Sequence, residues 1–182
     1  MRALVRSMKG NHRAKPAVIF SNNADAAGIA WARTQGLATE IVDHRPFGEN
    51  RTGFENAIND ALKPHEPDVI CLAGFMRVLT AGFVDAWKGK MLNIHPSLLP
   101  KYRGLNTHRR ALEAGESEHG CTVHLVTPEL DEGPILGQSK VQVLDGDTPD
   151  ALAARVLQQE HILYPVVLER FAKGLTDPIL LS

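Results

Sequence analysis

The sequence predicts an α/β protein with an open, mostly parallel, Rossmann-like sheet and helices on both faces. Short apolar runs alternate along the chain with segments of helical period, which is typical of such sheets. The run 69–73 contains no polar alternation, as expected for a strand that helices cover on both faces. Because 182 residues fit a single domain, we expect one domain over 1–182.

The first half of the chain is expected to hold two strands and two helices. They cover residues 17–20, 24–35, 37–42 and 51–65. Asn23 can cap the start of the first helix, and Gly36 is placed to end it. The second helix has one apolar face, made by Phe54, Ala57, Ile58, Ala61 and Leu62.

The second half continues the alternation. After the strand at 69–73 we expect strands and helices at 91–94, 106–114, 121–126 and 135–143. The last long helix begins at Thr148 as its cap, with Pro149 in the first turn. Pro165 lies inside this helix and is expected to kink it.

Composition excludes several classes of partner. Lysine and arginine number 20 against 21 acidic residues, so no basic excess exists to bind nucleic acid. No apolar run reaches the roughly 18 residues of a membrane span, and the N-terminus lacks a signal-peptide core, so we expect a cytoplasmic protein. Cys71 and Cys121 both lie in apolar stretches and are interpreted as reduced core thiols.

Three segments follow predicted strands, and ligands of open α/β sheets bind at the carboxyl ends of strands. These segments, 74–77, 93–100 and 127–134, are expected to meet. Asn93 and His95 are two residues apart, so in an extended chain their side chains point to the same side. An amide N–H and an imidazolium N–H aimed at one point can stabilise an oxyanion. Asp131 could orient the imidazole and hold it protonated.

No nucleophile stands beside His95, which favours direct acyl transfer between two bound substrates. Ser97 is interpreted as a hydroxyl that caps the loop. Simpler alternatives exist: His95 could be a structural hydrogen-bonding residue, and 131–134 could be an ordinary turn. A zinc site is not expected, because strand alternation places His124 on the face opposite to His119 and Cys121.

Several motifs together resemble the phosphoribosylglycinamide formyltransferases, the folate-dependent transformylases of purine synthesis. The resemblance covers almost the whole chain and is carried by residues 74–79, 93–102, 104–109, 119–124 and 129–131. Two related classes fit less well. Formyltetrahydrofolate deformylases have a second histidine where this chain has Pro96 and carry an extra N-terminal domain. Methionyl-tRNA formyltransferases add a C-terminal tRNA-binding domain.

The resemblance implies a reaction between two small molecules, 10-formyltetrahydrofolate and glycinamide ribonucleotide, without a metal. It implies that His95 is the general acid and an oxyanion donor, that Asn93 polarises the formyl oxygen, and that Asp131 keeps His95 charged. The implied folate contacts are Arg51, Asn93, Met76, Arg77, Val78 and Leu79. The implied ribonucleotide contacts are Gly74, Pro96 and Glu160.

Glu160 has independent support from the sequence. It falls on the apolar stripe of the last helix, four residues after Val156. A carboxylate there must be paired or functional, and a substrate amine would satisfy it.

The chain departs from the resemblance at its N-terminus. The family begins with an apolar strand and a Gly-x-Gly-Ser-Asn loop that holds the substrate phosphate at a helix N-terminus. Residues 1–5 match the helix after that loop. We therefore expect a catalytic domain truncated at its N-terminus, with Met1 an internal methionine of a longer protein. If the chain is complete as given, a folate-binding remnant without catalysis becomes the alternative.

Overall fold

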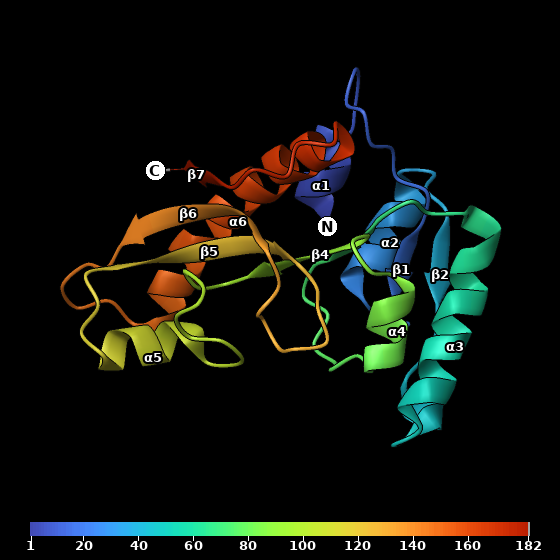
Figure 1. Ribbon diagram of the computed structural model, residues 1–182, viewed down its shortest axis with the longest axis horizontal. Helices are drawn as coiled ribbons and strands as arrows, with labels where there is room; N and C mark the ends of the chain where they lie inside the picture. Colours follow the sequence, from blue (N-terminus) through green and yellow to red (C-terminus); the bar gives the residue numbers. More distant parts are fainter. Residues whose placement is uncertain (182) are drawn as a thin grey trace.

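The strands of the computed structural model form two sheets within residues 1–181, the residues that the structure describes (Figure 1). In the smaller sheet β1 (Ile19–Ser21) pairs in parallel with β2 (Thr39–Ile41). The larger sheet has the strand order β3-β4-β5-β6-β7. Its strands are β3 (Ile70–Leu72), β4 (Met91–His95), β5 (Glu118–Leu125), β6 (Ile135–Gln142) and β7 (Ile179–Leu181). Strand β5 runs antiparallel to both of its neighbours, and the other pairings are parallel.

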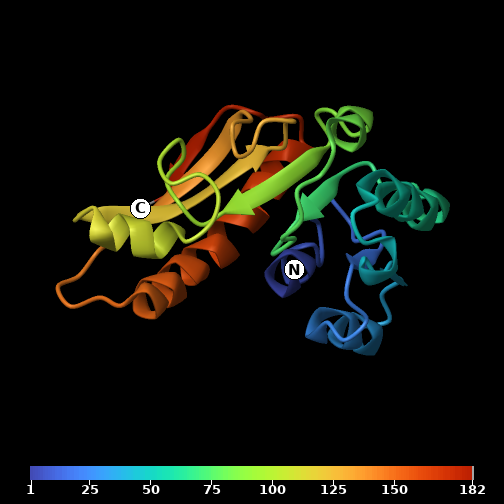
Figure 2. The same cartoon turned by 90° about the horizontal axis from the view of Figure 1, so that it is seen from below.

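Helices lie on both faces of the larger sheet at β4, and α6 packs against one face of β5 and β6 (Figures 1 and 2). They are α1 (Arg2–Ser7), α2 (Ala27–Thr34), α3 (Arg51–Leu62), α4 (Ala81–Ala86), α5 (Thr107–Glu113) and α6 (Pro149–Ala172). Two short 3₁₀ segments lie at Arg45–Phe47 and Lys63–His65. Met91 packs in a core with α3 and α4, whereas its neighbour Leu92 packs in a second core with α1 and α6. Successive residues of β4 therefore supply opposite layers. In residues 1–181 no helix combines the length and the apolar character needed to cross a membrane.

Each helix and strand expected from the sequence is present, with shifts of a few residues at its ends. Thr148 caps α6 by accepting a hydrogen bond from the Ala151 N–H at 3.2 Å, as expected. Gly36 follows α2 with φ +69°, a conformation that favours glycine. The α-helical part of α3 ends at Leu62 and a 3₁₀ turn replaces its predicted last residues. Helix α6 continues through Pro165 without a break.

The prediction that Asn23 caps α2 is wrong. The N-cap of α2 is Ala26, whose side chain makes no capping hydrogen bond. Asn23 instead closes a turn before the helix, where its side-chain oxygen accepts from the Asp25 N–H at 3.0 Å. The side-chain amide thus satisfies a turn donor rather than a helix donor.

A groove of about 1130 Å³ lies between the two sheets. It is lined by both β1 and β3. The Ile19 and Ile70 N–H groups bond away from the groove, to Ala38 and Lys90 respectively. Because backbone groups alternate along a strand, the N–H groups of the next residues, Phe20 and Cys71, point toward the groove. No strand pairing joins β1 to β3 in the described part of the chain.

The unpaired edges predict a pattern of amide hydrogen exchange. Phe20 and Cys71 are expected to exchange faster than the adjacent Ile19 and Ile70, whose N–H groups are hydrogen-bonded. Residue-resolved exchange by NMR measures the difference, and Ile19 and Ile70 serve as internal controls in the same strands. Equal protection within each pair would show that the groove is closed by pairing in solution.

Candidate active site

His95 lies at the carboxyl end of β4 with a hydrogen-bond acceptor on each ring nitrogen. Nε2 donates to the Tyr102 carbonyl oxygen at 3.0 Å, and Nδ1 lies 3.4 Å from Asp131 Oδ2. A carbonyl and a carboxylate can only accept, so both nitrogens must carry hydrogen for both contacts to be favourable. The side chain of His95 is only 6% exposed. Both ring nitrogens of this nearly buried side chain therefore face acceptors.

Asp131 connects the third loop to this site, as the sequence predicts. Its side chain is 9% exposed, and Oδ2 accepts a hydrogen bond from the Gly104 N–H at 2.9 Å. Asp131 has φ +54°, which places it in a tight turn. An ion pair between Arg103 and Glu132 joins the same two loops at the surface. The segment is therefore a turn, and this turn places the Asp131 carboxylate beside His95.

His124 is a site residue that sequence reasoning did not select. In the antiparallel register of β4 and β5 it lies opposite Asn93, and its Nε2 is 3.2 Å from Asn93 Nδ2. Its Nδ1 donates to the Leu125 carbonyl oxygen at 2.9 Å, and Nε2 is 3.7 Å from Asp131 Oδ1. Burial lowers the pKa of His124, so the neutral ring is favoured. From the sequence, strand alternation argued only against His124 as a zinc ligand. Its contact with Asn93 depends on the pairing of β5 with β4, which the sequence does not reveal.

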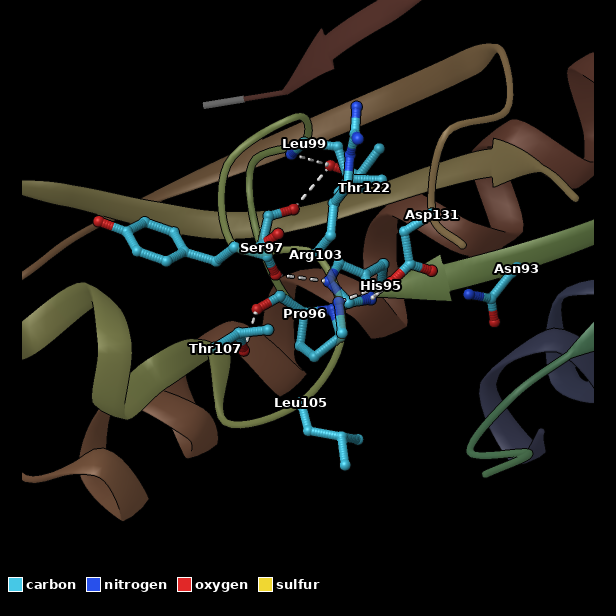
Figure 3. A network of polar contacts seen from close by, with 12 residues as sticks. Asn93, His95, Pro96, Ser97, Leu99, Arg103, Leu105, Thr107, Thr122 and Asp131 are labelled. Atoms are coloured by element: carbon cyan, nitrogen blue, oxygen red, sulfur yellow. Dashed lines mark hydrogen bonds and ion pairs between the residues drawn. The ribbon is translucent and has the colours of Figure 1, made fainter. Parts of the chain in front are cut away.

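Buried hydrogen bonds hold the loop that follows His95 (Figure 3). The Ser97 hydroxyl donates to the Lys101 carbonyl at 2.6 Å, which confirms its interpretation as a loop-capping group. Thr122 Oγ1 donates to the Ser97 carbonyl at 2.6 Å and accepts from the Leu99 N–H at 3.1 Å. It also accepts from the Gln138 side-chain amide at 3.0 Å. One threonine hydroxyl thus fixes several points of the loop.

The predicted folate-contact segment adjoins Asn93. Leu72 at the end of β3 is in register with Asn93 on β4, so the residues after β3 leave the sheet beside the site. Met76 and Val78 are 81% and 61% exposed, which leaves apolar side chains open to solvent. The Arg77 guanidinium lies over the ring of Phe54, 5.6 Å from its centre.

Other predicted binding residues lie on separate elements around the sheet. Leu79 belongs to the core under α3, and Arg51 is exposed at the first position of that helix. Gly74, with φ +71°, is exposed directly after β3. The Pro96 carbonyl accepts from the Thr107 hydroxyl at 2.7 Å, which ties the loop to α5.

Glu160 is half-buried on α6, on the side that faces the Met1 amine. Burial raises the pKa of Glu160, and the Met1 amine opposes this effect. Within residues 1–181 no hydrogen bond or ion pair joins Glu160 to the residues around His95. The prediction that the Glu160 carboxylate binds a substrate amine therefore stays a prediction.

His119 and Cys121 of β5 lie in different surroundings. His119 Nε2 lies 3.2 Å from His108 Nδ1, and burial lowers the pKa of His119 to about 4. Cys121 packs in the core with α6, and burial raises the pKa of its thiol to about 12. The described residues contain no cluster of three or more potential metal ligands.

An α/β sheet that brings the side chains of an asparagine, a histidine and an aspartate together at a strand end has the donors that stabilise an oxyanion, as in acyl-transfer proteins. The family model described as "Formyl transferase" matches residues 1–168, and this chain belongs to that family.

Two relatives illustrate the similarity. Phosphoribosylglycinamide formyltransferase of Escherichia coli strain K12 is 49% identical over 167 residues, which cover 92% of this chain and 76% of the relative. The human trifunctional purine biosynthetic protein adenosine-3 is 43% identical over 175 residues, which cover 96% of this chain and 17% of that much longer protein.

Solved structures show the same fold. The phosphoribosylglycinamide formyltransferase of Brucella melitensis superposes with a TM-score of 0.89 at 50% identity, covering 96% of this chain and 90% of that one. Glycinamide ribonucleotide transformylase 1 of Symbiobacterium toebii gives a TM-score of 0.90 at 41% identity, with coverage of 95% and 82%.

The buried hydroxyl of Thr122 predicts a large effect on stability. Thr122→Val removes the donor to the Ser97 carbonyl and the acceptor for the Leu99 N–H. Each buried group left unsatisfied costs about 1–3 kcal/mol, so the free energy of unfolding is expected to fall by at least that amount. Denaturant unfolding measures it. Thr122→Ser keeps the hydroxyl and is the matched control; equal losses in both variants would contradict a role for the hydrogen bonds.

Proposed function

We propose that this chain transfers the formyl group of 10-formyltetrahydrofolate to the amine of glycinamide ribonucleotide, a step of purine biosynthesis. The observation that carries the proposal is the grouping of Asn93, His95 and Asp131 at the carboxyl end of β4. The family and the names of its relatives support the choice of donor and acceptor. The reaction needs no metal ion.

The chemistry follows from the charges of these side chains. The substrate amine attacks the formyl carbon, and the carbonyl oxygen becomes an oxyanion. Asn93 donates an amide N–H to this oxygen, and the His95 imidazolium donates its Nδ1–H. Asp131 competes only weakly for the same hydrogen, because its Oδ2 lies 3.4 Å from Nδ1. The amine loses a proton as the bond to the folate nitrogen breaks, and that nitrogen gains one. Asp131, which stabilises the charged imidazole, is placed to pass this proton through water.

The substrates are assigned to opposite sides of the site. We place the folate against Arg51, Asn93 and residues 76–79, where exposed Met76 and Val78 offer apolar contacts. We place the ribonucleotide against Gly74, Pro96 and Glu160, whose carboxylate would bind the attacking amine before transfer. Residues 1–182 then act as a single catalytic domain.

A transfer assay tests this function. The chain is incubated with glycinamide ribonucleotide and 10-formyltetrahydrofolate, and formylated ribonucleotide and formate are both quantified. We expect formylated ribonucleotide. Formate without transfer would identify a hydrolase instead, and folate binding without either product would identify a binding protein.

The groove between β1 and β3 motivates a second arm of the assay. A variant that carries an apolar strand and a glycine-rich loop ahead of Met1 can pair with both open edges. A lower KM for the ribonucleotide in this variant would show that a strand in the groove completes the substrate site. An unchanged KM would show that the ribonucleotide is bound without it.

Substitutions at His95 and Asp131 test the assigned roles. We expect His95→Ala and Asp131→Asn each to lower kcat by about 100-fold to 10,000-fold, because both groups act on a proton or charge that develops in the transition state. Folate affinity should change little. Steady-state kinetics and equilibrium folate binding measure the two effects. Glu132→Gln, on the adjacent exposed carboxylate, is the control; near-normal turnover in either active-site variant would refute the roles.

A further inference from the structure

Asn93 can face the substrate in two ways, because its amide can rotate to exchange oxygen and nitrogen. Only the nitrogen can donate a hydrogen bond to an oxyanion. An amide turned the other way would place its oxygen near the developing negative charge and oppose the reaction. The orientation of this side chain therefore decides whether Asn93 can assist transfer at all.

The structure provides a group that selects one orientation. His124 lies directly opposite Asn93 across the β4–β5 pair, at the separation where cross-strand side chains meet. His124 Nδ1 must carry hydrogen, since it donates to the Leu125 carbonyl at 2.9 Å. In the neutral ring Nε2 is then an acceptor, and the atom of Asn93 beside it at 3.2 Å is the donor Nδ2. One amide hydrogen is used by His124, and the second is free for the substrate.

We propose that His124 is a positioning residue that holds the Asn93 amide with its second N–H directed at the transferred formyl group. The assignment rests on the proposed formyl transfer for its chemistry, but the amide orientation itself does not depend on any reaction. His124 is only 3% exposed in its side chain, so water does not readily replace it as the acceptor.

Protonation of His124 would reverse this arrangement. An Nε2–H cannot accept from Asn93, and it would instead attract Asp131 Oδ1, now 3.7 Å away. His95 and Asp131 are the other titratable groups that face this ring, from β4 and from the loop after β5. With a neutral His124 ring, Asp131 pairs with His95, and the second N–H of Asn93 can donate to the substrate.

Two variants of His124 separate its acceptor from its size. His124→Phe keeps a ring but removes both nitrogens, whereas His124→Gln can keep an acceptor near the position of Nε2. Loss of one oxyanion donor costs about 100-fold to 1,000-fold in kcat, so we expect the phenylalanine variant to lose up to that factor with little change in KM. The glutamine variant should recover a large part of the loss.

A double-mutant cycle identifies the residue through which His124 acts. If it acts through Asn93, His124→Phe should cause little further loss of kcat in the Asn93→Ala background. A full additional loss in that background would overturn the proposal and assign the effect to Asp131. Equal loss in the phenylalanine and glutamine variants would also overturn it. Denaturant unfolding of each variant establishes that the fold persists.

A measurement on the substrate-free protein tests the positioning role of His124 independently of the proposed reaction. The side-chain amide signals of Asn93 in a ¹⁵N NMR spectrum report its hydrogen bond in the substrate-free protein. We expect them to shift or broaden in His124→Phe and to stay close to the wild type in His124→Gln. Unchanged signals in both variants would refute the positioning role, even in a protein that transfers formyl groups. If the wild-type chain transfers nothing while the signals respond as expected, the proposed function fails and the positioning role stands.

Discussion

The Asp131 carboxylate is the group on which the arrangement of the site depends. Its side chain is nearly buried, and a buried carboxylate requires hydrogen-bond donors around it. The Gly104 N–H and the His95 ring supply them from two different loops. Without the carboxylate, His95 Nδ1 would have no acidic partner, and Gly104 would lose the acceptor that holds its loop. A single nearly buried carboxylate therefore contacts both the loop that contains Gly104 and the ring of His95.

Strand β5 supports this site because it runs antiparallel to β4. In that register Thr122 lies opposite His95 and His124 lies opposite Asn93, so two residues of one β5 face meet the two donors of β4. Thr122 holds the backbone of the loop after His95, and His124 contacts the amide of Asn93. A parallel strand connected by a helix would give a different register and would not by itself place these pairs. The antiparallel part of the sheet is thus tied to the geometry of the site.

The sequence was sufficient for the parts that depend on local pattern. The apolar run at 69–73, the capping Thr148 and the two-residue spacing of Asn93 and His95 each correspond to the structure, because burial, capping and strand alternation act over a few residues. Short elements such as α4 and β7 were not predicted, since six or three residues carry too little periodicity. The position of His124 against Asn93 could not be read, because strand register depends on pairing between distant segments.

The gap between β1 and β3 shows that an apolar sequence pattern can predict a strand without predicting its pairing partner. Both strands were predicted from apolar composition, and both exist, yet they do not pair with each other. Each is hydrogen-bonded on its other side, so each can form without the missing contact. Asn93, His95 and Asp131, the residues proposed to act in catalysis, lie on β4 and the loop after β5, on the side of β3 away from the groove. The geometry around His95 is consequently independent of the groove, whereas any substrate group that must reach β1 is not.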